Sequence, residues 1–245
     1  MPDSTYPSGD VAAEDRGRII DFPADRRSGS PPQNNLPLQL TSFVGREREV
    51  AALEALLTTE ARLLTLTGSG GSGKTRLALA VSSRLTERFE EGVWWVELAP
   101  VSDPELVPQA VAQALMIREE PGRSLAETLA RDLAPTELLL VLDNCEHLIS
   151  SCARLANAVL SACPRVRILA TSRETLAVEG EMTWPVQPLS APESRNLGAG
   201  ELEQYESVRL FVERARYRKP TFALDERNAA PVAEIWAAST AYHWP

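Results

Sequence analysis

LLTLTGSGGSGKTRLALAV, residues 63 to 81, decides the fold of this chain. The segment Arg62 to Thr67, which overlaps its start, is short and apolar and is followed at once by glycines, as in a buried strand. Beyond the glycines, apolar side chains recur at helical spacing to about Phe89. Strand, glycine-rich loop and helix form the context that the pattern GxxxxGK[ST] requires. The sequence therefore predicts a P-loop.

The predicted loop supplies the groups that a nucleotide phosphate needs. Its candidate binding residues are Gly68, Ser69, Gly70, Gly71, Ser72, Gly73, Lys74 and Thr75. Glycines let successive N–H groups turn toward a β-phosphate, and the following helix adds its positive end. We expect Lys74 to bridge the β- and γ-phosphates and the Thr75 hydroxyl to bind Mg²⁺. The predicted cofactors are ATP or ADP with Mg²⁺.

A second ligand for Mg²⁺ is expected where the apolar stretch LLLVLD (138–143) ends. Asp143 closes this predicted strand, and ligands of open α/β sheets bind at the carboxyl ends of the strands. Asp143 is also suited to cap the following helix, predicted from Glu146 to Cys163. Glu146 is a candidate general base or, equally, an acid favoured by the helix dipole in the first turn.

Arg173 follows the strand predicted in VRILATS (166–172). In this kind of sheet, that strand lies between the strand of Asp143 and the P-loop strand, so its end faces the γ-phosphate. An arginine there distinguishes ATP from ADP by a charge-assisted contact. The alternative is a solvated surface arginine. The candidate catalytic residues are thus Lys74, Asp143, Glu146 and Arg173.

Strands and helices alternate through the middle of the chain, with further strands predicted at 93–98 and 182–188 and helices at 104–116 and 125–133. This alternation predicts an α/β fold, a P-loop NTPase parallel sheet flanked by helices. Trp94 and Trp95, in mid-strand, are predicted to pack in the core and between strands.

Four segments are expected along the chain. Residues 1–38, rich in proline and polar side chains, predict a disordered tail, and residues 39–190 the P-loop ATPase domain. Residues 191–205 are expected to be a linker. Residues 206–245, with helices predicted from Glu206 and over 226–236, predict the start of a truncated helical domain.

The composition of the sequence limits the classes of partner that this chain is expected to bind. A net charge of −9 argues against direct nucleic-acid binding by this chain. No apolar run is long enough to span a membrane, and acids interrupt the first twenty residues, so no membrane partner or signal peptide is expected. Cys145, Cys152 and Cys163, spaced by about whole helical turns, predict one buried helix face. Together these features predict a soluble protein of the cytoplasm.

With these residues in place, the chain resembles the signal-transduction ATPases with numerous domains. It is close to NB-ARC proteins and, in particular, to the ATPase module of large LuxR-type and AfsR-type bacterial transcriptional regulators. The matching segments are NLPLQLTSFVGRERE (35–49), LLTLTGSGGSGKTRLALAV (63–81), GVWWVELAP (92–100), LLLVLDNCEHL (138–148), RILATSRE (167–174) and SVRLFVERAR (207–216). The resemblance implies an ATP/ADP-controlled switch, in which nucleotide holds an α/β domain against a helical domain.

The resemblance also implies roles for single residues. It assigns Val44 and Arg46 to base and ribose contacts, and Arg173 to the terminal phosphate. Many relatives have an acid directly after the aspartate, where this chain has Asn144, so slow hydrolysis is expected. The winged-helix region, C-terminal repeats and DNA-binding helix-turn-helix of the relatives are absent from this sequence.

The last residues, IWAASTAYHWP (235–245), show no helical pattern where relatives have a GLPLA segment. Back-translated with G/C-ending codons and with one base restored, this stretch reads ICGGVDGLPLA. We therefore expect that a single-base deletion or a sequencing error truncated a longer regulator.

Two other functions compete with the switch. An AAA+ remodelling motor would need a ring-forming arginine finger and sustained turnover. A P-loop small-molecule kinase would need an arginine-rich lid and an acceptor pocket.

Overall fold

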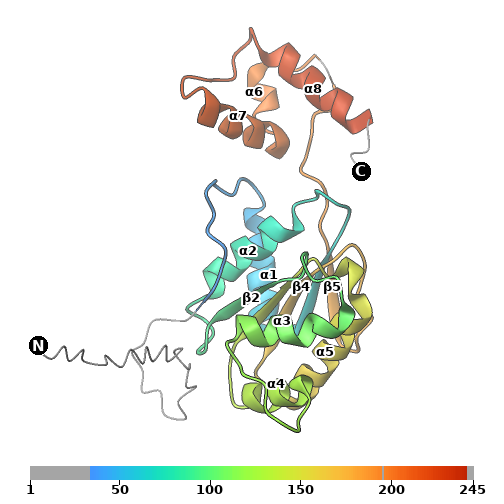
Figure 1. Cartoon of the computed structure of the whole chain (residues 1–245). Coiled ribbons are helices and arrows are strands. Elements are labelled where there is room, and N and C mark those ends of the chain that lie inside the picture. Colours follow the sequence, from blue (N-terminus) through green and yellow to red (C-terminus); the bar gives the residue numbers. More distant parts are fainter. Residues whose placement is uncertain (1–33, 195, 242–245) are drawn as a thin grey trace, which may run out of the picture. The chain divides into compact units, whose positions relative to one another are not determined.

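The computed structural model describes residues 34–194 and 196–241 of the 245-residue chain. Its centre is a sheet of five strands, all parallel to their neighbours, in the order β2-β3-β4-β1-β5 (Figure 1). The strands are β1 Leu63–Thr67, β2 Val93–Glu97, β3 Leu139–Asp143, β4 Arg167–Thr171 and β5 Glu181–Pro185. The predicted α/β fold is confirmed, and β4 lies between β3 and the P-loop strand β1 as expected.

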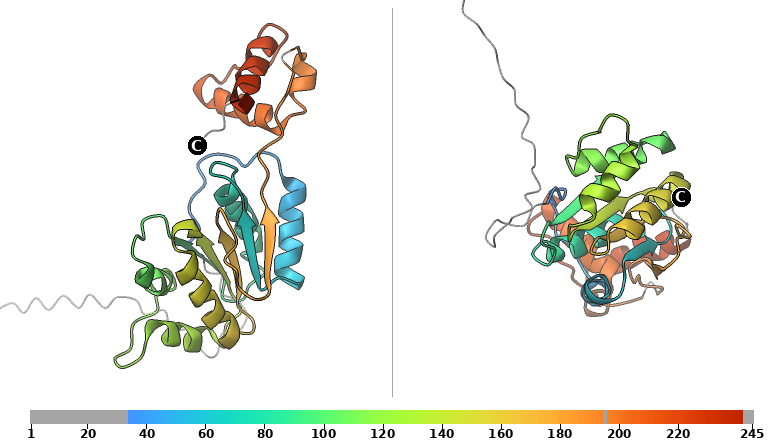
Figure 2. Two further views of the ribbon diagram at one scale, coloured as in Figure 1. Left: turned by 90° about the vertical axis from the view of Figure 1, so that its right-hand side faces the viewer. Right: turned by 90° about the horizontal axis from the view of Figure 1, so that it is seen from below.

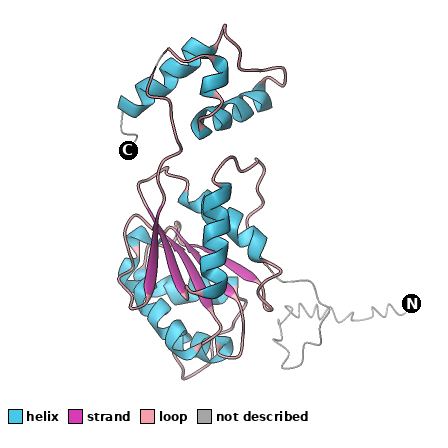
Figure 3. Ribbon diagram, turned by 180° about the vertical axis from the view of Figure 1, so that it is seen from behind, coloured by secondary structure: helices cyan, strands magenta, loops and turns pink. Residues whose placement is uncertain are grey.

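Helices cover both faces of the sheet (Figures 1 and 2). One face carries α1 and α2, and the other carries α3, α4 and α5. The elements of these layers are α1 Glu47–Thr59, α2 Lys74–Leu85, the 3-10 turn η1 Pro104–Leu106, α3 Val107–Ala114, α4 Leu125–Leu133, the 3-10 turn η2 Cys145–His147 and α5 Ile149–Ala162. Figure 3, which is seen from behind Figure 1, shows α1 in front of the sheet. Among the described residues, no helix is both long and apolar enough to cross a bilayer.

The core follows from alternation along the strands. Alternate strand residues, such as Leu64 and Leu66 of β1, are fully buried in one cluster with the apolar stripes of α1 and α2. Their neighbours point to the other face, because successive side chains of a strand alternate. Trp94 and Trp95 are both buried, and the Trp94 indole N–H donates to the Glu91 carbonyl. The packing role predicted for both tryptophans is confirmed.

The edge strand β2 is covered by residues from the segment expected to be a disordered tail. Asn34 forms a parallel bridge with Val93. The Asn35 amide group donates to the Trp95 carbonyl at 2.8 Å and accepts from the Trp95 N–H at 2.6 Å. Residues 34 to 36 are therefore held at the sheet edge, where free backbone groups need partners. The rest of the predicted tail, residues 1–33, lies outside the described residues.

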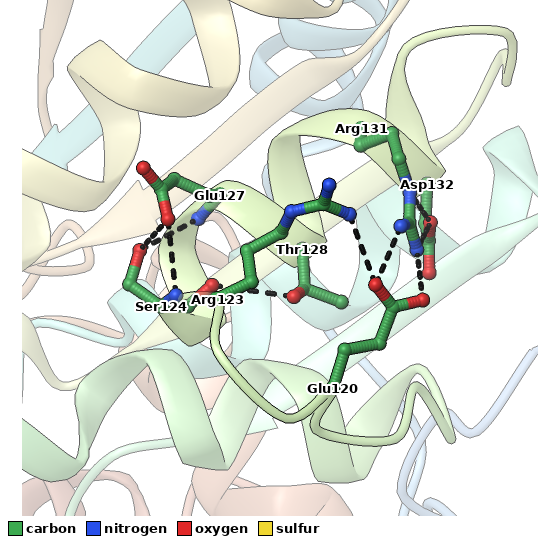
Figure 4. A network of polar contacts seen from close by, with 7 residues as sticks. All are labelled: Glu120, Arg123, Ser124, Glu127, Thr128, Arg131 and Asp132. Atoms are coloured by element: carbon green, nitrogen blue, oxygen red, sulfur yellow. Dashed lines mark hydrogen bonds and ion pairs between the residues drawn. The ribbon is translucent and has the colours of Figure 1, made fainter.

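The helix α4 begins and ends as predicted, and Figure 4 shows why it begins there. The Ser124 hydroxyl accepts from the Glu127 N–H while the Glu127 carboxylate accepts from the Ser124 N–H, which is a capping box. Farther along, Arg131 forms ion pairs with Glu120 and Asp132. These exposed pairs add little stability.

The segment predicted as a helix from Glu146 to Cys163 is shorter in the structure. Residues 145–147 form η2, and α5 begins only at Ile149. All three cysteines are buried, but only Cys152 lies inside α5, so the prediction of one cysteine-bearing helix face is wrong. The left-handed backbone of Asn144 (φ 68°) separates the turn from the strand, which periodicity does not reveal.

A second hydrophobic cluster belongs to the helices α6 Ala199–Leu202, α7 Glu206–Arg218 and α8 Ala229–Ala241. Leu202 of α6 is fully buried in this cluster, so the helical group begins before the boundary expected at residue 206. The helix α8 also continues to Ala241, through residues that showed no helical pattern in the sequence. Residues 242–245 lie outside the described part of the chain.

Candidate functional site

The candidate site lies at the carboxyl ends of β1, β3 and β4. The loop of residues 68–73 leaves β1 and enters α2, whose N-cap is Gly73. Gly68 has a φ of 149°, and a Cβ there would lie 2.8 Å from the Val186 carbonyl oxygen. Only glycine fits at that point, because the loop passes directly beside the segment after β5.

The Lys74 side chain folds back over this loop. Its Nζ donates to the carbonyl oxygens of Gly68 at 2.8 Å and Ser69 at 2.9 Å, and the residue is buried. Burial lowers the pKa of Lys74; Arg173 lowers it further, while Glu146 and Asp143 raise it. The Lys74 ammonium group thus lies on the loop, close enough to Glu146, Arg173 and Asp143 for their charges to act on it.

Asp143 anchors a set of hydroxyl groups. Its Oδ1 accepts from the Thr75 hydroxyl at 2.9 Å and from the Thr171 hydroxyl at 2.6 Å. The Thr171 hydroxyl in turn accepts from the Asn144 N–H at 2.9 Å. Thr171 was not predicted as a site residue, although its position at the end of a buried strand was a usable signal. Asp143 caps neither η2 nor α5, whose N-caps are Asn144 and Leu148, so the capping alternative is wrong.

These residues fit a nucleotide with its metal. The Thr75 hydroxyl and the Asp143 carboxylate are the hard oxygen ligands that Mg²⁺ takes, and they already lie within hydrogen-bond distance of each other. In the loop, the buried Ser72 hydroxyl has no hydrogen-bond partner among the described residues. A buried polar group of this kind calls for a polar ligand.

Glu146 and Arg173 meet beside the loop. Arg173 Nε lies 3.3 Å from Glu146 Oε1, and a Cβ on Gly70 would lie 3.6 Å from Arg173 Nη2. Both candidates therefore flank the P-loop, although the Arg173 side chain is 66% exposed. Glu146 is an acid in the first turn of the short 3-10 helix η2, and the first turn of α5 contains no acid.

Asn144 occupies a position with its own backbone demand. Its φ of 68° and ψ of 53° are left-handed, a conformation in which asparagine is several-fold enriched. This explains why asparagine suits the position after Asp143. His147 is exposed, and its Nε2 lies 2.8 Å from the Val101 carbonyl oxygen.

The two residues assigned by resemblance to the base and ribose lie in the loop before α1. Val44 is half-buried there. Arg46 is buried, and its guanidinium contacts the carbonyl oxygens of Ser72 and Gln187. The structure thus brings Arg46 to the P-loop.

Comparison with known proteins gives a consistent result. Residues 42–178 match the model of a family described as "AAA ATPase domain". An uncharacterized protein of Mycobacterium tuberculosis is 39% identical over 203 residues, which are 83% of this chain and 48% of that protein. A protein of the same organism named "Putative HTH-type transcriptional regulator" is 41% identical over 174 residues, 71% of this chain and 18% of its own length. The chain spans half or less of the length of these relatives.

Two solved structures share the fold. A signal transduction ATPase with numerous domains from Pyrococcus horikoshii, which carries a tetratricopeptide repeat sensor, aligns with a TM-score of 0.50 and 13% identity, over 86% of this chain and 30% of its own. The ORC2 protein of Aeropyrum pernix, solved as ADPNP and ADP complexes, also aligns with a TM-score of 0.50. Its identity is 14%, over 81% of this chain and 70% of its own. The resemblance drawn from the motifs is confirmed.

Proposed function

Because the chain belongs to the AAA ATPase domain family, we propose that it is the ATP/ADP-binding switch module of a signal-transduction ATPase from a transcriptional regulator. The observation that carries the proposal is the group of hydrogen-bonded side chains at the carboxyl ends of the strands. Lys74 lies on the loop carbonyls, and Asp143 accepts from the hydroxyls of Thr75 and Thr171. A glycine turn without a ligand would not need these groups together.

In the proposed complex, Lys74 exchanges its bonds to Gly68 and Ser69 for the β- and γ-phosphates, which accept more strongly because they are charged. Thr75 and Asp143 hold Mg²⁺, which neutralises phosphate charge when it is bound. Val44 is proposed to pack against the base. The complex structure named for the ORC2 protein supports nucleotide binding on this fold.

Hydrolysis is proposed to be slow, because the candidate base is engaged. The Oε1 atom of Glu146 is paired with Arg173 Nε at 3.3 Å, so this oxygen is oriented toward the arginine and not toward an attacking water. Asn144 also replaces the acid that many relatives carry after the aspartate. Slow turnover suits a switch, since the bound state then persists long enough to be read by a partner.

The remaining partners are proposed to lie in other parts of such a protein. The relative named as a regulator is much longer than its matched stretch, and its name includes a helix-turn-helix. With a net charge of −9, the present chain is not proposed to grip nucleic acid. We propose the cytoplasm as its compartment.

Two measurements test the function. A titration of fluorescent ADP with and without Mg²⁺ is expected to show tight, magnesium-assisted binding; no binding of ADP or ATP at millimolar concentration would overturn the proposal. Steady-state phosphate release is expected to be very slow. Fast, sustained release would favour a remodelling motor, and release that depends on an added acceptor would favour a small-molecule kinase.

A further inference from the structure

The buried arginine of the loop before α1 makes contacts that differ from the base or ribose contact implied by the resemblance. Only 4% of the Arg46 side chain is exposed. Its Nη2 donates to the Ser72 carbonyl at 2.9 Å and to the Gln187 carbonyl at 2.6 Å. An Nη2 group carries two hydrogens, so both are already used on backbone carbonyls.

The other end of the guanidinium is buried beside a carboxylate. Arg46 Nη1 lies 3.5 Å from the Glu49 carboxylate one turn along α1, and it makes no hydrogen bond within the described residues. The backbone is also fixed, since the Arg46 N–H donates to Glu206 Oε1 at 3.1 Å. Directly before it, Gly45 has a φ of 76°, and a Cβ there would lie 2.7 Å from that same oxygen. A contact of Nη2 with a ribose or base would break its bonds to the Ser72 and Gln187 carbonyls, and Nη1 is buried beside Glu49.

The contact with Ser72 fixes a peptide of the P-loop. The described peptide bonds are all trans, so the Ser72 carbonyl and the Gly73 N–H point in opposite directions. With the carbonyl held by Arg46, the Gly73 N–H points away from the arginine. The next peptide is held too, because the Gly73 carbonyl accepts from the Leu77 N–H at 2.9 Å.

Gly73 is the N-cap of α2, where free N–H groups form the anion-binding end of a helix. We propose that Arg46 is a positioning residue for the phosphate-binding amides. It holds the Ser72–Gly73 peptide so that the Gly73 N–H faces the β-phosphate, and it makes no contact with the base or ribose. This inference rests on the proposed function, because it names a residue that prepares the same site.

Arg62 offers a matched control from the opposite end of the sheet. Its Nη2 also donates to two backbone carbonyls, those of Leu160 at 2.8 Å and Cys163 at 2.7 Å. Arg62 directly precedes β1, whereas the P-loop follows β1. Arg46→Met and Arg62→Met thus remove the same kind of bond pair, one beside the P-loop and one remote from it.

The experiment measures the affinity of wild type, Arg46→Met, Arg46→Lys and Arg62→Met for ADP, 2′-deoxy-ADP, GDP and inorganic pyrophosphate, with melting temperatures alongside. Arg46→Met is expected to weaken the affinities for ADP and pyrophosphate by the same factor, about tenfold. This is roughly the contribution of one hydrogen bond to a charged phosphate, which the unheld Gly73 N–H would no longer make. Arg46→Lys recovers part of the loss, because one ammonium group can donate to both carbonyls. Arg62→Met lowers the melting temperature but leaves all four affinities unchanged.

Three results would overturn the inference. In the first, pyrophosphate binds Arg46→Met as tightly as wild type while ADP is lost. In the second, wild type discriminates between ADP and 2′-deoxy-ADP, or between ADP and GDP, and Arg46→Met does not, which would place the arginine on the ribose or base. In the third, Arg62→Met weakens pyrophosphate as much as Arg46→Met, which would make the effect one of stability alone. Failure of the proposed function looks different, since wild type itself would then bind no ADP.

Discussion

The α/β body, residues 34–190, and the helical part, residues 196–241, bury very different amounts of apolar surface. In the body, whole strands such as β3 are buried from end to end. In the helical part, the described residues form one small buried cluster, which consists of Leu202, Val208, Val212, Ala229, Val232 and Ala233. The residues proposed to bind phosphate and metal all lie in the body. A large core is what holds such side chains to within a fraction of an ångström.

A matched pair of leucines gives the largest expected effect and tests this difference directly. Leu64 in the body and Leu202 in the helical part are both fully buried. Leu64→Ala is expected to cost about 3 kcal/mol of unfolding free energy and to loosen the whole sheet. Leu202→Ala is expected to cost about 2 kcal/mol, at the low end of the range, because a small cluster collapses more easily around a gap.

Hydrogen exchange measured by mass spectrometry separates the two outcomes. Leu64→Ala should speed exchange across β1, β3 and β4, whereas Leu202→Ala should speed it only within residues 199–233. If Leu202→Ala loosened the sheet as much as Leu64→Ala does, the two regions would form one cooperative unit and the comparison would fail.

Lys74→Ala has the next largest effect and is confined to function. Within the part of the chain that the structure describes, the Lys74 ammonium donates hydrogen bonds to loop carbonyls only, so its loss should leave exchange in both regions close to wild type. ADP affinity is expected to fall by about a hundredfold, the equivalent of two charge-assisted hydrogen bonds. A fluorescent-ADP titration checks this, with Lys219→Ala as a control, since Lys219 is exposed and lies at the end of α7. Unchanged affinity in Lys74→Ala would remove the P-loop assignment.

The two regions also differ in how far the sequence predicts them. In the body, apolar runs bounded by glycines and acids placed every strand, and the order of motifs placed β4 beside β1. The P-loop after β1 and the end of β3 then bring Lys74, Thr75 and Asp143 to the same edge of the sheet, as expected. In the helical part, α6 and the continuation of α8 were missed, because Gly198 and the alanines of α8 give no clear amphipathic period.

Within the body, predictions from the sequence failed where an element boundary or a contact depends on the folded backbone. The left-handed Asn144 leads into η2 and so delays the start of α5 to Ile149, and no periodicity encodes that. The ordered segment at Asn35 depends on one side chain that pairs with a strand far away in sequence. The bonds of Arg46 to the Ser72 and Gln187 carbonyls could not be predicted either, because these two stretches meet the arginine only when the chain is folded.

Arg173→Ala is expected to have a smaller and selective effect. The proposed contact exists only with a γ-phosphate, so ATP affinity should fall by about tenfold while ADP affinity changes little. The substitution also frees Glu146 from its ion pair. Arg165→Ala is a suitable control, since Arg165 pairs with Glu137, outside the candidate site. Parallel titrations with ADP and a nonhydrolysable ATP analogue measure the effect; equal losses for both nucleotides would make Arg173 a general surface charge.

Thr171→Val is expected to have the smallest effect, and it tests whether a strand end of the body sets the metal ligand. Valine keeps the shape but removes the hydroxyl that donates to Asp143 at 2.6 Å and accepts from the Asn144 N–H. The half-buried Asn144 N–H then lacks its partner, which costs about 1 kcal/mol of stability. Asp143 loses one of the two donors that orient it, so the Mg²⁺ concentration needed for half-maximal ADP binding should rise a few-fold. Thr171→Ser keeps the hydroxyl and should behave as wild type in the magnesium titration, even if its lost methyl lowers stability. If valine and serine shifted the magnesium requirement equally, packing and not the hydroxyl would set the position of Asp143.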